Sequence, residues 1–198
     1  KDDEINNMFR QIKKAIKSSN RKKYIYAYWH GFDSDAHDTG VNSKKTERHF
    51  KEIDKKLRKF IKSLKGMNTT LIITADHGFI DTPENRNIWI EKHPVFQECL
   101  TVPLCGEGRT PFCYVHPSKT KKFENYVITK MKKYSYIFKT EDLIKKNYFG
   151  LFKPHKKLFD RLGDYILFCK ENYRIKDVVG KKQTREYIWH HGGTAEDE

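Results

Sequence analysis

Apolar residues recur every three to four positions in two stretches of the first third of the chain. The first stretch covers residues 2–19, and its apolar positions are Ile5, Met8, Phe9, Ile12 and Ile16. The second covers residues 43–64, with Phe50, Ile53, Leu57, Phe60, Ile61 and Leu64. This spacing places each set on one face of an α-helix, so both stretches predict amphipathic helices. Gly66 is expected to end the second helix.

Two short β-prone runs flank the second predicted helix. Residues 23–29 are mostly aromatic, and residues 69–74 contain the apolar run Leu71-Ile72-Ile73. A strand, a helix and a strand in this order predict a βαβ unit with a right-handed parallel crossover. The aromatic run also fits base stacking, but burial in a sheet is the favoured interpretation.

The remaining pattern predicts shorter elements and a division of the chain. After an irregular segment at 82–100, strands are expected at 112–116, 135–138 and 164–169, and helices at 119–133 and 140–146. Together these predict an α/β fold with a mainly parallel sheet flanked by helices. We expect an α/β core in residues 1–104, a small α+β cap subdomain in 105–160, and a return to the core in 161–198.

Composition and charge narrow the class of protein. The formal net charge is +14, but the lysines are spread along the chain, which favours a solvated basic surface over a nucleic-acid-binding face. No apolar run is long enough to span a membrane, and no signal peptide is visible, so a cytoplasmic location is expected. The four cysteines form no C-x-x-C pair, which argues against a zinc ribbon. The oligomeric state stays open.

Three short segments contain residues suited to metal chemistry. Asp33 and His37 follow the first predicted strand, and Asp76 and His77 follow the next one. The carboxyl ends of parallel strands are where ligands and catalytic groups gather in open α/β sheets. Carboxylate oxygen and imidazole nitrogen are ligands for zinc, manganese and similar ions.

The third segment lies near the end of the chain, where two adjacent histidines precede a glycine pair. His191 is favoured over His190 as a ligand because the glycines follow it directly and let the backbone approach a ligand closely. Gly40 is expected to turn the backbone away after the first segment.

The motifs D-x-x-x-H-x-x-G, T-A-D-H-G and H-G-G, in this order, resemble those of the alkaline phosphatase superfamily, and within it the type I phosphodiesterase/nucleotide pyrophosphatase family. The resemblance implies an alkaline phosphatase-like fold, metal-dependent hydrolysis of phosphodiester or pyrophosphate bonds, and a nucleotide or other phosphodiester as substrate. It also implies two divalent metal ions, with zinc favoured and manganese as the alternative. The residues that it assigns to one ion are Asp33, His37 and His191, and those that help to hold the second are Asp76 and His77.

The chain departs from the family pattern in one respect. The family's Thr or Ser nucleophile, and an Asp ligand on the first strand of its sheet, are expected upstream of Lys1. The chain therefore resembles the carboxyl-terminal portion of such a hydrolase, and we expect it to be inactive in isolation. The alternatives are a phosphomonoesterase or phosphoglycerate mutase of the same superfamily, or a non-catalytic module that binds a metal or a polyanion.

Overall fold

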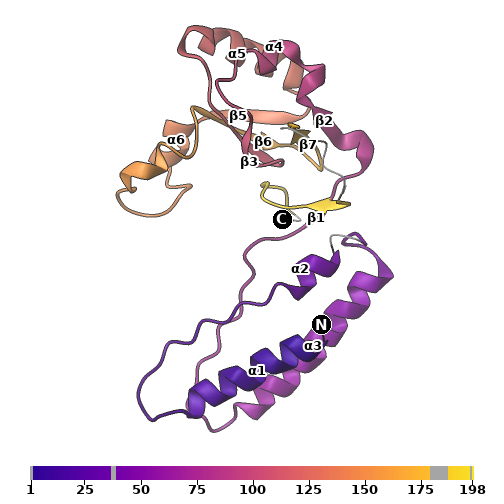
Figure 1. The fold of residues 1–198 in the computed structure, drawn as a ribbon, viewed down its shortest axis with the longest axis vertical. Helices are drawn as coiled ribbons and strands as arrows, with labels where there is room; N and C mark the ends of the chain where they lie inside the picture. Colours follow the sequence, from indigo (N-terminus) through magenta and orange to yellow (C-terminus); the bar gives the residue numbers. More distant parts are fainter. Residues whose placement is uncertain (1, 37–38, 179–186, 197) are drawn as a thin grey trace. The chain divides into compact units, whose positions relative to one another are not determined.

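The structure is a computed structural model that describes residues 2–36, 39–178, 187–196 and 198. By their contacts the residues form two compact units, Lys1–Asp76 and His77–Glu198 (Figure 1). Among the described residues, no helix combines the length and the apolar character needed to cross a bilayer. The predicted boundaries at residues 104 and 160 remain predictions.

The first unit contains three helices, α1 (Asp2–Lys17), α2 (Gly31–Ala36) and α3 (Lys44–Ser63). The two predicted amphipathic helices are therefore confirmed as α1 and α3, and they pack through the stacked rings of Phe9 and Phe60, whose centroids lie 4.4 Å apart. Helix α3 begins where the Ser43 hydroxyl accepts a hydrogen bond from the backbone N–H of Thr46 at 3.1 Å. It ends just before Gly66, which has the positive φ of +81° that favours glycine.

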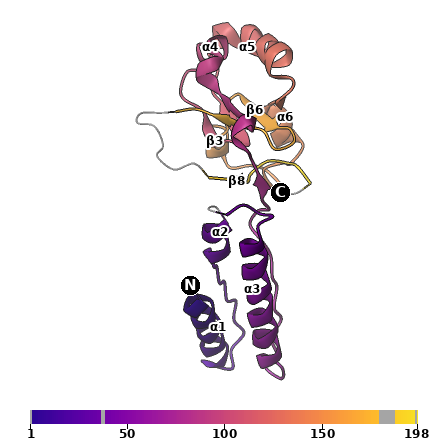
Figure 2. The same ribbon diagram turned by 90° about the vertical axis from the view of Figure 1, so that its right-hand side faces the viewer.

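The two β-prone runs beside α3 are not strands in this structure. Residues 22–30 and 69–75 run as extended chain and pair with no strand among the described residues (Figures 1 and 2). Their large side chains are exposed, with Tyr24 at 91%, Tyr26 at 76% and Ile72 at 84%. The predicted βαβ unit and the predicted burial of the aromatic run are therefore wrong here, because no neighbouring strand among the described residues covers these side chains or completes their hydrogen bonds.

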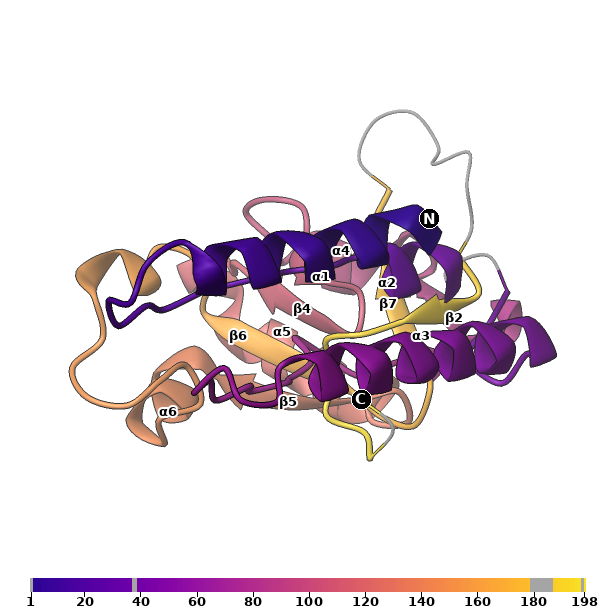
Figure 3. The same cartoon turned by 90° about the horizontal axis from the view of Figure 1, so that it is seen from below.

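The second unit is built on a four-stranded sheet of order β3-β4-β6-β5. Its strands are β3 (Cys105–Glu107), β4 (Thr110–Cys113), β5 (Ser135–Lys139) and β6 (Tyr165–Cys169), and every neighbouring pair is antiparallel. Strands β4, β5 and β6 are labelled in Figure 3. Two short pairs complete the strand content. One is the parallel pair of β2 (Asn87–Trp89) and β7 (Arg174–Lys176), and the other is the antiparallel pair of β1 (Ile80–Asp81) and β8 (Trp189–His190). Mixed helices and small sheets are thus present, and a predominance of parallel pairing is not confirmed.

The helices of the second unit cover the two faces of β6. They are α4 (Pro94–Gln97), α5 (Thr120–Tyr126), a π-helical turn at Val127–Met131 and α6 (Thr140–Lys145), with 3₁₀ turns at Glu84–Arg86, Ile90–Lys92, Pro117–Lys119 and Lys156–Leu158. Leu167 of β6 belongs to the larger core cluster, which contains Phe96 of α4 and Phe123 of α5. Ile166 belongs to a second cluster with Leu143 of α6. This alternation follows from the two-residue period of a strand and buries β6 on both faces.

The sequence pattern predicted the central strands and two of the α-helices of this unit, but not β1, β2, β3, β7, β8 or α4. The predicted strands 135–138 and 164–169 and the predicted helix 140–146 are confirmed as β5, β6 and α6. The predicted helix 119–133 is confirmed as α5, although it continues as the π-helical turn. Strand β4 overlaps the predicted strand 112–116 but begins and ends earlier in the chain.

Candidate metal centre

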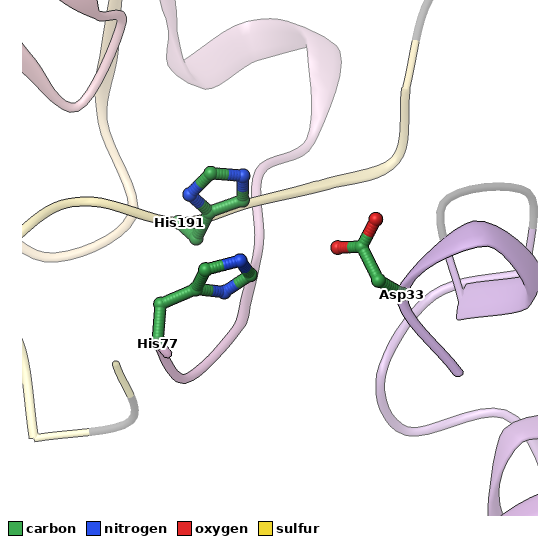
Figure 4. A group of neighbouring side chains, drawn as sticks. All are labelled: Asp33, His77 and His191. Carbon is green, nitrogen blue, oxygen red and sulfur yellow. The ribbon is translucent and has the colours of Figure 1, made fainter. Parts of the chain in front are cut away.

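The pairing of β1 with β8 brings two predicted ligands together from opposite ends of the second unit. Ile80 lies opposite His190, so the chains that continue from this pair place His77 and His191 on the same side of the ribbon. Their imidazole rings are stacked, with centroids 3.8 Å apart and planes inclined by 13° (Figure 4). One ring nitrogen of His77 and one of His191 lie within 4.8 Å of each other. Both side chains are partly exposed.

Aromatic packing holds this ribbon in place. Trp189 is fully buried, and its ring meets that of Phe79 edge to face at 4.2 Å. The Phe79 ring also meets the His77 imidazole edge to face at 5.0 Å. The backbone N–H of Thr82 donates to the carbonyl of Ile188 at 2.8 Å, which extends the pairing by one further bond. The sequence did not indicate this packing because Phe79 and Trp189 are far apart in the chain.

The tautomer of His77 follows from its hydrogen bond. Its Nδ1 lies 3.0 Å from the carbonyl oxygen of Gly78, and a carbonyl can only accept, so Nδ1 carries the proton. In the neutral ring, Nε2 is then the unprotonated nitrogen, and a neutral imidazole is the form that binds metal ions. In metal-binding histidines, the ring nitrogen that does not bind the metal usually donates a hydrogen bond, which fixes the orientation and the tautomer of the ring.

His190 has a different environment from His191. Its ring nitrogens are contacted by the guanidinium of Arg174, which can only donate, at 3.0 Å for Nδ1 and more closely for Nε2. Arg174 is buried and also donates to the side-chain oxygen of Asn87 at 3.1 Å. The His190 ring is therefore in close contact with an arginine cation, which disfavours a metal ion at the same ring. Arg174 was not identified from the sequence.

The first unit brings together the two predicted carboxylates. The Tyr28 hydroxyl donates a hydrogen bond to Asp76 Oδ2 at 3.1 Å. The pKa of Tyr28 is raised mainly by this bond and by the Asp76 charge, and the Asp33 charge raises it further. Both acids therefore act on one phenol. Tyr28 was predicted to be a buried sheet residue, whereas it is 57% exposed and contacts a predicted ligand.

Local sequence explains how Asp33 is presented. Asp33 lies in the first turn of α2 and is labelled in Figure 4. A Cβ at Gly31 would meet the ring of Trp29 at 2.4 Å, so glycine is required where α2 begins. After α2 the chain turns at Gly40, whose φ of +78° confirms the predicted turn. The buried hydroxyl of Thr46 donates to the Gly40 carbonyl at 2.7 Å and ties this turn to α3.

The donor atoms fit divalent metal ions. Within the second unit His77 and His191 offer imidazole nitrogens, and within the first unit Asp33 and Asp76 offer carboxylate oxygens. Each is a ligand type that zinc accepts. The remaining predicted ligand, His37, lies outside the described residues.

Solved structures of two kinds of hydrolase are similar in fold. Murine ectonucleotide pyrophosphatase/phosphodiesterase 5, inactive and in complex with AMP, has a TM-score of 0.67 and 22% identity, over 93% of this chain and 48% of its own. The human form has a TM-score of 0.67 and 23% identity over the same shares. Phosphonoacetate hydrolase from Sinorhizobium meliloti 1021, in complex with phosphonoformate, has a TM-score of 0.57 and 16% identity, over 83% of this chain and 42% of its own. The chain thus spans about half the length of these structures.

A search of the curated proteins gave no significant match. The family model of type I phosphodiesterase/nucleotide pyrophosphatase, by contrast, matches residues 1–194, which is nearly the whole sequence. The motif order that suggested this family lies entirely within the matched range. The chain belongs to the type I phosphodiesterase/nucleotide pyrophosphatase family.

Proposed function

We propose that the chain supplies the metal-binding part of a phosphodiesterase/nucleotide pyrophosphatase that depends on two divalent ions, with zinc favoured. In this proposal Asp33, His37 and His191 hold one ion, and Asp76 and His77 help to hold the second. The family match supports hydrolysis of phosphodiester or pyrophosphate bonds. The nucleophilic Thr or Ser that this family requires is expected upstream of Lys1.

The stacking of His77 and His191 is the observation that carries the proposal. The lone pair of an imidazole nitrogen lies in the plane of its ring, so nearly parallel rings cannot direct both lone pairs at one point. With centroids 3.8 Å apart and one nitrogen of each ring within 4.8 Å of the other, the two rings instead offer donor atoms to two neighbouring points. Two-metal phosphoesterases hold their ions roughly 3.5–4 Å apart, which suits one histidine for each ion.

When bound, the ions would polarise the phosphoryl oxygens and stabilise the leaving oxygen. The residues of this chain have supporting tasks. The Gly78 carbonyl keeps the proton of His77 on Nδ1, and thereby keeps Nε2 unprotonated. The Tyr28 hydroxyl holds the Asp76 carboxylate in a fixed orientation.

A nucleotide is the proposed substrate class. The murine phosphodiesterase 5 structure contains AMP, and that protein is similar to this chain in fold. We therefore expect a nucleoside monophosphate to bind the zinc-loaded chain. The same affinity is expected to vanish when a chelator removes the zinc.

Calorimetric titration with Zn²⁺ tests the metal assignment. His191→Ala and His77→Ala are each expected to weaken zinc binding by at least about tenfold. His190→Ala is the matched control, because His190 is the neighbouring imidazole but faces Arg174. Equal losses for His190→Ala and His191→Ala would show that the wrong histidine has been assigned.

Hydrolysis itself is tested on a protein that combines this chain with a segment supplying the nucleophilic Thr or Ser. A p-nitrophenyl phosphodiester should be cleaved faster than the p-nitrophenyl monoester, and both rates should vanish with chelator. A preference for the monoester would favour the phosphomonoesterase alternative.

A further inference from the structure

A charged pair is buried beside the segment that contains His191. The guanidinium of Arg109 meets the carboxylate of Glu198 in a two-pronged contact, with Nε to Oε1 at 2.8 Å and Nη2 to Oε2 at 2.5 Å. The side chains are 0% and 2% exposed. Taking two charges out of water is costly, so a pair this deeply buried calls for a reason beyond surface attraction.

Arg109 belongs to a rigid part of the second unit. With Gly108 it forms the two-residue turn between β3 and β4. The Arg109 carbonyl accepts a hydrogen bond from Cys169 of β6 at 3.0 Å, and the Gly108 carbonyl accepts one from Ile175 of β7 at 2.8 Å. Arg109 Nη1 donates to the Tyr173 carbonyl at 2.6 Å. The arginine is thus fixed both by its backbone and by its side chain.

Glu198 connects Arg109 to the loop that follows His191. Its carboxylate accepts hydrogen bonds from the backbone N–H groups of Gly193 at 2.9 Å and Ala195 at 3.3 Å. The carbonyl of Gly192 accepts a further hydrogen bond from the hydroxyl of Thr110, the residue after Arg109. Both residues directly after His191 are therefore bound, directly or through Glu198, to the same β-turn.

The glycine at position 193 fits this arrangement closely. A Cβ at Gly193 would lie 2.3 Å from Glu198 Oε2 and 2.8 Å from Arg109 Nη2. Any larger residue would push the loop away from the charged pair. The second glycine of the H-G-G motif is therefore explained by contact with the pair.

We propose that the buried Arg109–Glu198 pair is a positioning device for His191, which fixes the loop after this histidine and so holds its imidazole in the orientation that a divalent cation requires. The inference rests on the proposed function, because it assumes that His191 is a metal ligand. The arginine and the glutamate do not contact the metal themselves. They act through the backbone of Gly192 and Gly193.

The test compares Zn²⁺ affinity by calorimetry in the full chain and in Glu198→Ala. Partners that orient metal ligands typically contribute about 10–100-fold to metal affinity, and a loss of this size is expected for the variant. Glu98→Ala is the matched control, since it removes an exposed glutamate that pairs with Lys119 and Lys122 in the same unit. This control is expected to bind zinc like the wild type.

Glu198→Gln supplies a graded variant. The amide keeps the length of the side chain and an oxygen for the Gly193 N–H, but it presents N–H groups to an arginine that can only donate. Its zinc affinity is expected between those of the wild type and Glu198→Ala. A well-folded Glu198→Ala, judged by circular dichroism, that binds zinc as tightly as the wild type would overturn the proposal.

Amide hydrogen exchange of the wild type tests the same inference without a variant. The inference can therefore be tested even if Glu198→Ala fails to fold. Coupling between two sites is reciprocal. Zinc is therefore expected to slow exchange at the Gly193 and Ala195 amides, and unchanged exchange in the zinc-bound protein would refute the inference. If His191→Ala leaves zinc affinity unchanged, the proposed function fails first, which is a separate outcome.

Discussion

Hydrogen-bond partners, rather than residue types, separate the roles of neighbouring residues in this chain. His190 and His191 are adjacent and chemically identical, yet one faces a guanidinium and the other stacks on His77. The alternation of side chains along β8 and beyond separates them. The sequence favoured His191 as a ligand because of its glycine neighbours, but it gave no sign of the arginine that contacts His190.

The phenol of Tyr28 reports on the carboxylate of Asp76. Because a carboxylate accepts the phenolic proton and repels phenolate, the pKa of Tyr28 is raised above its ordinary value of 10.0. In the metal-free protein, Asp76→Asn is expected to lower this pKa, measured by NMR titration of labelled tyrosine. Asp54→Asn, whose acid pairs with Arg58 on α3, is the control and should leave the titration unchanged. An unchanged Tyr28 titration in Asp76→Asn would disprove the contact.

Glu198 should make stability depend on pH. Burial alone would raise its pKa, but hydrogen bonds from Arg109 and the loop amides outweigh this effect and lower the pKa below the ordinary 4.5. The unfolded chain therefore binds the proton more readily than the folded chain. The stabilisation is complete above pH 4.5 and is lost as the pH falls through the lowered folded value.

Chemical unfolding of the wild type and of Glu198→Gln at a series of acidic pH values measures this effect. The free energy of unfolding of the wild type should fall more steeply with acidification than that of the variant, which has no carboxyl group to titrate at this position. Parallel curves would mean that the carboxylate is not stabilised by its partners in the folded protein.

At the scale of elements, the periodicity of apolar residues predicted the positions of individual helices and strands, which depend on local sequence. Helices α1 and α3 and strands β5 and β6 lie where their apolar patterns placed them. The strands expected at 23–29 and 69–74 are extended but unpaired, because pairing depends on partners that a local pattern does not specify. For the same reason the family resemblance grouped the predicted ligand motifs, whereas the sequence gave no sign of Arg109, Glu198 or Tyr28.

Strand β6 is central to the second unit. Replacing one of its buried side chains by alanine tests this role. Leu167→Ala removes a fully buried side chain and is expected to reduce the free energy of unfolding by about 2–5 kcal/mol. Leu151→Ala is the matched control, because Leu151 is 73% exposed and should change stability by no more than about 0.5 kcal/mol. Denaturant titration followed by circular dichroism measures both. Similar losses for the two variants would contradict the assignment of the core.

At the scale of the whole molecule, the two units differ in how they use apolar side chains. In the second unit most of them form two buried clusters around β6. In the first unit, Tyr24, Tyr26 and Ile72 on the extended segments are largely exposed. Where exposed apolar side chains form a contiguous patch, the patch commonly marks a surface that contacts other molecules.

This exposed surface should bind an apolar dye. The chain is expected to enhance the fluorescence of anilinonaphthalene sulfonate, and the double variant Tyr26→Lys, Ile72→Lys should reduce the enhancement. The substitutions lie outside the core of the second unit, so its cooperative unfolding is expected to be retained. Equal fluorescence from variant and wild type would indicate that these segments are covered in solution.

The net charge of +14 keeps a polyanion-binding module as an alternative to the proposed hydrolase. The two functions differ in how binding depends on salt and on metal. A polyanion is bound by releasing counterions, so its affinity falls steeply with salt and does not depend on a metal. Binding of AMP at the proposed centre has the opposite dependence, since it requires the ligands His77 and His191 together with zinc. Fluorescence titrations with AMP and with an unrelated DNA oligonucleotide, at two salt concentrations and with or without chelator, distinguish metal-dependent from charge-dependent binding.

We expect AMP binding to be abolished by chelator and by His191→Ala, and any oligonucleotide binding to be abolished by salt alone. AMP binding that resists chelator but disappears with salt would assign the basic surface, and not the histidines, as the binding site.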